Sequence, residues 1–390
     1  MNTMVSIKET RNSNINPKIY DFLSPDYVYI PIKEGFKLNI KEGDNVLKES
    51  VILKDSFNNK IYSPISGIFN GVVRDMRINN KLIDCICIEN DYMEKLNKRR
   101  STIKYISEYS KEDVFKLISK YTVCKYKLDI DYKTIIINGI DKDPFEKTNS
   151  YIIDTNIDKI LETIDALSNI LEVKDTIFCI NNNDTNNVIN LTNNIGTYPN
   201  IKLKLVPDIY PIGYKDILIS NILTKKQLNS NYLYLTVGDV LNIYNILKRK
   251  KPICEKLITI SGNAIKNPVV ANVKIGTTLN DVLKECVTID NIKYKVIVNG
   301  LLNGITINTA NNIITEDIRS IFLNTIDTSK ENKCINCGLC TMKCPVGLNP
   351  KYIREHKKAD RSKCIHCGLC SYICPAKINF KPYLGGNEDE

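Results

Sequence analysis

The cysteines near the C-terminus carry the clearest chemical signature in the sequence. The pattern Cys-x2-Cys-x2-Cys-x3-Cys-Pro occurs in residues 334–345 and again in residues 364–375. Three thiolates at this spacing wrap one corner of an iron-sulfur cubane, and Gly338 or Gly368 lets the backbone pass close to the inorganic sulfides. In two-cluster ferredoxins the fourth Cys of each run binds the other cluster. The sequence therefore predicts two [4Fe-4S] clusters, one held by Cys334, Cys337, Cys340 and Cys374 and the other by Cys364, Cys367, Cys370 and Cys344.

Zinc is the alternative metal, because four thiolates also suit a tetrahedral zinc site. With a net charge of +10, the chain would then be a zinc-stabilised module that binds nucleic acid. Zinc ribbons, however, pair two Cys-x2-Cys knuckles and have no use for a third Cys or a Cys-Pro ending. We therefore favour iron-sulfur clusters and expect no nucleic-acid partner. His366 lies between two ligands of an already complete quartet, so we expect it to face solvent, and we expect His356 to lie on the surface without a partner.

The surroundings of the clusters suggest both shielding and docking. Apolar residues between the ligands are expected to keep water from the sulfides, a determinant of reduction potential; they are Ile335, Leu339, Ile365, Leu369, Tyr372 and Ile373. Basic residues would offset the negative clusters and offer a face to an acidic redox partner; they are Lys333, Lys343, Lys351, Lys357, Lys358, Lys363 and Lys377.

Six further cysteines complete the total of 14 in the 390-residue chain. The N-terminus has no apolar signal region, and no apolar run reaches the roughly 18 residues of a membrane span, so we expect a cytoplasmic protein without structural disulfides. Cys85 and Cys87 alternate along a predicted strand and are expected to be buried, as is Cys179. Cys124 is a structural residue or, alternatively, a reactive thiol activated by nearby lysines. Cys254 and Cys286 have no partner at ligand spacing.

The elements that position these residues suggest a multi-domain α/β protein. Residues 1–100 alternate short strands with glycine turns, and the run 40–69 resembles the barrel-sandwich hybrid of biotinyl and lipoyl carrier domains, with Gly43 and Gly67 at positive φ. No exposed lysine stands where the swinging arm would attach.

Residues 101–252 alternate apolar strands with amphipathic helices, which is typical of a parallel, doubly wound sheet. The predicted strands are 134–138, 176–180, 202–206 and 232–237. Residues 253–325 look like a small β-rich unit with one helix at 278–285, and residues 326–390 form the cluster domain.

Taken in order, these segments resemble the C subunit of the Rnf electron transport complex and its relatives, including the Rnf C-like protein that accompanies clostridial proline reductase. The resemblance rests on the barrel-sandwich start, on the two ferredoxin runs and on four shorter segments: 138–145, Tyr210-Pro-Ile-Gly213, Thr236-Val-Gly238 and Ser261-Gly-Asn-Ala264. It implies an α/β domain similar to the FMN domain of the complex I flavoprotein subunit, followed by a β-grasp unit of the SLBB type.

The same resemblance implies an electron carrier subunit of an oxidoreductase system, and no catalytic residue is predicted. Its partners would be Rnf-type membrane subunits, with the protein peripheral on the cytoplasmic face, or a soluble reductase such as proline reductase.

One departure from this family concerns the nucleotide site. Members that bind FMN and nicotinamide carry a Gly-rich stretch whose bare amides approach phosphate, but residues 118–129 of this chain contain no glycine. We therefore expect no tight FMN or NADH site. Asp141 and Asp143 stand where the family has Glu, and they are either remnants of a flavin pocket or a solvated turn before Pro144.

Overall fold

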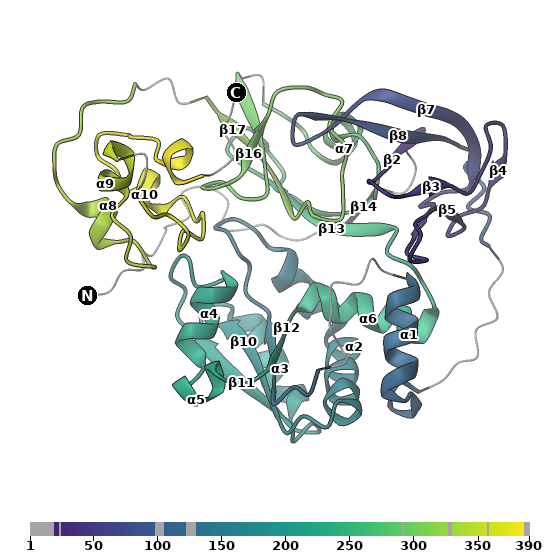
Figure 1. The fold of residues 1–390 in the computed structure, drawn as a ribbon, viewed down its shortest axis with the longest axis horizontal. Coiled ribbons are helices and arrows are strands. Elements are labelled where there is room, and N and C mark those ends of the chain that lie inside the picture. The colour runs from purple at the N-terminus through teal and green to yellow at the C-terminus, as the bar shows by residue number, and fades with distance from the viewer. Residues whose placement is uncertain are drawn as a thin grey trace.

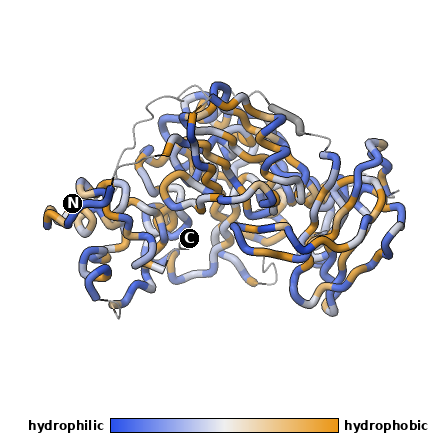
Figure 2. Tube along the Cα trace, turned by 90° about the horizontal axis from the view of Figure 1, so that it is seen from above, coloured by the Kyte–Doolittle hydropathy of each residue, from blue (hydrophilic) through white to orange (hydrophobic). Residues whose placement is uncertain are grey.

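The computed structural model describes residues 19–22, 25–97, 105–121, 130–290, 292–326, 330–356 and 359–385. Its elements form four groups (Figure 1), and the short helices of the C-terminal group lie at the opposite end of the molecule from the N-terminal strands. Hydrophobic and hydrophilic residues alternate along most of the trace (Figure 2). Within these ranges, no helix is both long and apolar enough to cross a membrane.

The N-terminal group consists of two antiparallel sheets around one core. The first contains β2 (Tyr27–Pro31), β8 (Lys81–Asn90), β7 (Gly67–Ile78) and β4 (Asn45–Val46), and the second contains β3 (Lys37–Leu38), β5 (Val51–Lys54) and β6 (Lys60–Tyr62). Side chains of both sheets, such as Ile52 and Ile88, share the core.

Two glycines of this group behave differently. Gly43 has the expected positive φ of 88°, whereas the expectation for Gly67 was wrong because it lies in extended backbone at the start of β7. A Cβ on Gly67 would stand 1.8 Å from the carbonyl oxygen of Glu89. Close strand approach, rather than a left-handed turn, therefore requires glycine there.

The α/β group is built on a four-stranded sheet in the order β11-β10-β9-β12, and every strand pair in it is parallel, as predicted. Its strands are β9 (Thr134–Asn138), β10 (Asp175–Asn181), β11 (Ile201–Val206) and β12 (Tyr232–Thr236). Its helices are α1 (Lys111–Tyr121), α2 (Thr148–Ile170), α3 (Thr185–Ile195), α4 (Lys215–Ile222), α5 (Lys225–Leu228) and α6 (Val237–Arg249), with the 3-10 turn η1 (Ile106–Glu108). Ile135 and Ile137 pack into one core with α1, α2 and α6, and Ile136 packs into another with α4. Helices therefore cover both faces of the sheet.

The third group is a six-stranded sheet in the order β1-β14-β13-β17-β15-β16. Its members are β13 (Glu255–Ser261), β14 (Val269–Lys274), β15 (Tyr294–Val298), β16 (Ile305–Ile307) and β17 (Ser320–Thr325), with the predicted helix seen as α7 (Leu279–Cys286). The edge strand β1 (Ile19–Phe22) comes from the N-terminus and pairs in parallel with β14. The first and third groups are thus interleaved in sequence.

The C-terminal group contains only short helices, because each begins inside or just after a cysteine run. They are α8 (Leu339–Met342), α9 (Pro350–Glu355), α10 (Leu369–Tyr372) and the 3-10 turn η2 (Lys381–Leu384). The group has a small core that includes Ile353, Ile378 and Phe380, and several cysteines pack against it.

Candidate metal centre and the adjoining cavity

Four cysteines from both runs line one cavity of about 460 Å³. Cys364, Cys367 and Cys370 come from the second run, and Cys344 is the last cysteine of the first run. This is the quartet that the sequence assigns to one cluster. The four residues therefore surround a shared space. Among the described residues, no three His, Cys, Asp or Glu side chains form a group that could hold a single metal ion. Metal ligation by all eight cysteines remains a prediction.

The glycines of the two runs have the same backbone conformation, and one of them, Gly368, lines this cavity. Gly368 has a φ of 72° and precedes α10, and Gly338 has the same φ and precedes α8. The two positions differ in their surroundings, since a Cβ at Gly368 would lie 2.1 Å from the carbonyl oxygen of Leu302, whereas one at Gly338 would meet nothing within 4 Å. The second run is therefore pressed against the loop between β15 and β16, and the first run is not.

Burial disfavours ionisation of the thiols in this cavity. Burial, reinforced by the neighbouring thiols, raises the pKa of Cys367 and of Cys370 to about 12. Such thiols become thiolates only when a cation binds them. Backbone amides already support two of the sulfurs: the N–H of Leu348 donates to Cys344 Sγ at 3.3 Å, and that of His366 donates to Cys364 Sγ at 3.4 Å. Amide donors to sulfur are a recognised determinant of cluster potential.

The other predicted quartet, Cys334, Cys337, Cys340 and Cys374, includes a residue that is exposed to solvent. Cys340 is buried in the core of the C-terminal group, and Cys334 and Cys374 pack against the same core. Cys337 is exposed. The first run therefore presents one of its thiols to solvent, whereas the second run faces the interior of the molecule.

The apolar residues between the ligands only partly shield the clusters. Leu369 is buried, and Ile365 and Ile373 are half-buried against Tyr210 and its neighbours, as expected. Ile335 and Tyr372, however, are 64% and 51% exposed, so the expectation was wrong for these two. The tight cysteine turns and one-turn helices direct only some of the intervening side chains inward.

The polar residues near the clusters also differ in part from expectation. His366 is exposed, as predicted. His356 is also exposed, but it is not partnerless, because its ring stacks on Tyr352 at 4.0 Å and its Nδ1 lies 3.0 Å from the carbonyl oxygen of Tyr352. Lys333, Lys363 and Lys377 are exposed and Lys343 and Lys351 half-buried, and Lys357 and Lys358 lie outside the described residues.

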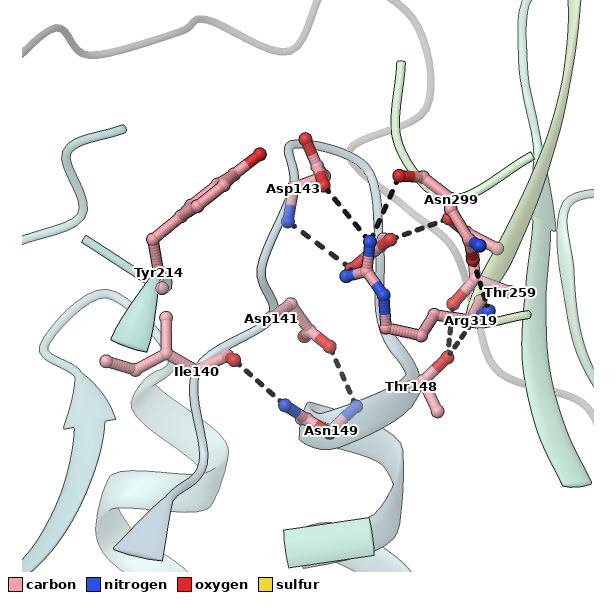
Figure 3. Close-up of polar contacts among 12 residues, drawn as sticks. Ile140, Asp141, Asp143, Thr148, Asn149, Tyr214, Thr259, Asn299 and Arg319 are labelled. Atoms are coloured by element: carbon pink, nitrogen blue, oxygen red, sulfur yellow. Dashed lines mark hydrogen bonds and ion pairs between the residues drawn. The ribbon is translucent and has the colours of Figure 1, made fainter. Parts of the chain in front are cut away.

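Asp141 and Asp143 do not form a solvated turn. Asp143 is 3% exposed, and its Oδ2 lies 3.6 Å from Arg319 Nη2 (Figure 3). Glu146 pairs with the same guanidinium at 3.4 Å. Burial, and then the charge of Glu146, raise the pKa of Asp143 against the opposing effect of Arg319. Arg319 precedes β17, so this ion cluster joins the α/β group to the six-stranded sheet.

Asp141 has a different role, at the start of α2. Its carboxylate accepts hydrogen bonds from the N–H of Asn149 at 2.7 Å and from the hydroxyl of Ser150 at 2.7 Å. Burial raises the pKa of Asp141 to about 6, although these hydrogen bonds lower it. The carboxylate thus satisfies amides at the helix N-terminus that would otherwise be available to an anion.

A second cavity of about 820 Å³ lies at the carboxyl ends of β9 and β12, where α/β folds bind ligands. A helix N-terminus is one place where such folds bind a nucleotide phosphate. The N-terminus of α2 is occupied by Asp141, and that of α6 by Asp239, whose carboxylate accepts from Thr236 N–H at 2.9 Å. Carboxylates of the chain itself therefore occupy these two helix N-termini. Residues 122–129, including Cys124, lie outside the described residues.

The two cavities share two wall residues, Lys142 and Arg319. Neither Arg319 nor Tyr210, whose hydroxyl donates to the carbonyl oxygen of Cys367, was singled out as a site residue from the sequence. The only sequence signal for Tyr210 was its place in the segment Tyr210-Pro-Ile-Gly213. Arg319 has no motif, and its two carboxylate partners, Asp143 and Glu146, lie more than 170 residues away.

The other cysteines among the described residues are buried, and Cys254 packs between groups, against Tyr62 and Tyr121. Cys85, Cys87 and Cys179 are all less than 9% exposed, which confirms the expectation for these three, and Cys254 and Cys286 are buried as well. Burial raises the pKa of Cys179 to about 12. These thiols are poorly suited to redox chemistry.

Family models and known proteins match this architecture. Residues 115–247 match the Nuo51 FMN-binding domain, and residues 326–375 match the 4Fe-4S dicluster domain. The C subunit of the ion-translocating oxidoreductase complex of Buchnera aphidicola is 24% identical over 84% of this chain and 75% of its own length. The C subunit of the proton-translocating ferredoxin:NAD(+) oxidoreductase complex of Clostridium ljungdahlii is 26% identical over 84% of this chain and 78% of its own length.

A solved NAD+-reducing [NiFe]-hydrogenase in the air-oxidized state is similar at a TM-score of 0.45, with 12% identity, over 60% of this chain and 47% of that one. The sequence matches are the stronger finding, because they run through the α/β group and both cysteine runs in one chain. The protein is therefore a homologue of the C subunits of Rnf-type ion-translocating oxidoreductase complexes.

Proposed function

We propose that this chain is an iron-sulfur electron-transfer subunit of an Rnf-type oxidoreductase complex and passes electrons through two [4Fe-4S] clusters. One observation carries the proposal: Cys344 of the first run lies around the same cavity as the three leading cysteines of the second. Crossed ligation of this kind is typical of two-cluster ferredoxins. When bound, the clusters supply one-electron carriers, and the chain supplies thiolates, amide donors and exclusion of water.

The structure also suggests an order for the clusters. The cluster assigned to Cys364, Cys367, Cys370 and Cys344 would face the α/β group and the six-stranded sheet. The other would lie nearer solvent, beside exposed Cys337 and Ile335. We assign the outer cluster to exchange with a partner protein that docks on the exposed apolar and basic face around it.

The loss of FMN and NADH binding is part of this proposal. Residues 118–129 contain no glycine, and the N-termini of α2 and α6 at the larger cavity are occupied by carboxylates of the chain itself. A second negative charge at these positions would be repelled. The match of residues 115–247 to an FMN-binding domain then reflects shared ancestry of the fold.

The partners follow from the relatives. We propose peripheral docking on membrane subunits at the cytoplasmic face, since the named relatives are subunits of ion- and proton-translocating complexes. A soluble carrier to a reductase such as proline reductase is the second candidate. We further assign the two-sheet N-terminal unit to the barrel-sandwich hybrid type and the six-stranded sheet to the SLBB type.

Anaerobic purification tests the proposal directly. About eight iron and eight sulfide per chain are expected for two cubanes, whereas zinc without sulfide would favour the nucleic-acid-binding module. Titration should show bleaching by dithionite but not by NADH. Stoichiometric flavin together with reduction by NADH would contradict the loss of the nucleotide site. Fractionation of native extract separates the two electron-transfer candidates, because a complex subunit should sediment with membranes.

A further inference from the structure

A buried polar bridge connects the α/β group to one predicted cluster ligand. The hydroxyl of Tyr210 donates to the carbonyl oxygen of Cys367. The same hydroxyl lies 3.3 Å from Asp143 Oδ1 and 3.1 Å from the hydroxyl of Tyr214. Tyr210 is 7% exposed and Asp143 is 3% exposed, so water contributes little screening. The bridge therefore brings a dipole and a charge close to the inner cluster site.

A phenol carries a single hydrogen, and this limits the bridge. Tyr210 can donate to the Cys367 carbonyl or to Asp143, but not fully to both at once. The carbonyl is the closer acceptor. Asp143 has a second partner in Arg319, which leaves the hydrogen of Tyr210 to the ligand.

The two members of the bridge should act on the cluster with opposite sign. The hydroxyl directs the positive end of its dipole at the ligand, which favours the more negative, reduced cluster. The carboxylate of Asp143 brings negative charge, which disfavours it. Hydrogen bonding around the ligands and local charge are levers by which proteins set cluster potentials.

We propose that the bridge formed by Asp143, Tyr210 and the carbonyl of Cys367 sets the reduction potential of the inner cluster. In this bridge Tyr210 is a positioning residue that holds the main chain at a ligand. The inference rests on the proposed function, because it requires a cluster held by Cys367. It adds a role for residues outside both cysteine runs.

The test is an anaerobic, EPR-monitored redox titration of the cluster-loaded protein at pH 8. In Tyr210→Phe we expect the equilibrium constant for reduction of one cluster to fall about tenfold, which for one electron is about 59 mV toward lower potential. Asp143→Asn should raise the same midpoint. The other cluster should keep its potential in both variants, and loss of one signal in Cys344→Ser identifies the inner cluster.

Tyr109→Phe is the matched control. Tyr109 is also buried, and its hydroxyl donates to a main-chain carbonyl, that of Leu247, at 3.1 Å. It lies in the α/β core rather than at a cysteine. A purely structural effect of losing a buried hydroxyl should lower the melting temperature of both Tyr variants and leave both potentials unchanged.

Unchanged midpoints in the Tyr210 and Asp143 variants would overturn the inference, as would an equal shift in Tyr109→Phe. If Tyr210→Phe does not assemble clusters, the direction of the shift in Asp143→Asn decides. Absence of iron and sulfide from the unaltered protein would instead overturn the proposed function, so the two failures are distinguishable.

Discussion

Gly338 and Gly368 occupy equivalent positions in the two cysteine runs, so the effects of the same substitution at the two positions can be compared directly. Both glycines have a φ of 72° and the same place in their motifs. Alanine at either position should lower the unfolding free energy by about 1–2 kcal/mol, because a side chain disfavours the left-handed backbone conformation. Any crowding of an inorganic sulfide by the new methyl group would be the same at both positions. Only at Gly368 would the Cβ lie 2.1 Å from a backbone oxygen, that of Leu302. To restore a normal contact the chain must move by about 1 Å, and such overpacking costs about 1–3 kcal/mol.

We therefore expect Gly368→Ala to lose about 2–5 kcal/mol and Gly338→Ala about 1–2 kcal/mol. Anaerobic thermal unfolding of the cluster-loaded proteins measures the difference. At about 2–4 °C per kcal/mol for a unit of 150–250 residues, Gly368→Ala should melt several degrees below Gly338→Ala. Iron content should be determined in parallel, so that loss of a cluster is not mistaken for packing strain. Equal melting temperatures would refute the close packing of the second run against the loop at Leu302.

Three further predictions concern charges. Arg319→Met should lower the unfolding free energy by about 3–5 kcal/mol, because it leaves Asp143 and Glu146 buried without their cation. The control Arg354→Met breaks the more exposed pair with Glu331 and should lower it by less than about 1 kcal/mol. Equal losses in the two variants would contradict the ion cluster. The pKa of Asp141 rises to about 6 in the folded state, so folding favours the protonated carboxyl. The stability that this proton contributes is fully present below the pKa of the unfolded state and is lost as the pH rises through 6. Between pH 5 and pH 7 the unaltered protein should therefore lose roughly 1 kcal/mol relative to Asp141→Asn, and a pH-independent difference in chemical unfolding would exclude this. Replacing Lys333, Lys363 and Lys377 by Glu should slow reduction by the physiological donor at low salt, and stopped-flow rates that do not change would argue against a basic docking face.

Local patterns in the sequence were sufficient for much of the fold and for the set of four cysteines that line one cavity. The spacing within each cysteine run fixes which thiols can share a turn, and apolar periodicity located the parallel strands 134–138 and 176–180 within a residue or two. The burial of Cys85 and Cys179 followed from their place inside apolar strands. These features depend on neighbours in sequence, which a single chain displays directly.

Contacts between distant segments could not be predicted in this way. Arg319 meets Asp143 and Glu146 across more than 170 residues, and Tyr210 meets Cys367 across 157. No periodicity links such positions. The same limit explains the wrong prediction for Gly67, because the close approach of the neighbouring strand, and not the local turn, excludes a side chain there. It also explains the turn of Asp141 and Asp143, because the polarity of these residues did not indicate that the turn is buried.

The placement of β1 bears on how the protein is made. This strand is translated before the other described strands, and its partner β14 follows roughly 250 residues later, which at bacterial or eukaryotic elongation rates is a wait of about 12–50 seconds. During that interval the segment has no strand to pair with, and a nascent chain stalled before β14 would display it to chaperones or to other copies. A change near β1 would thus act on an edge of the six-stranded sheet rather than on the two-sheet group nearest to it in sequence.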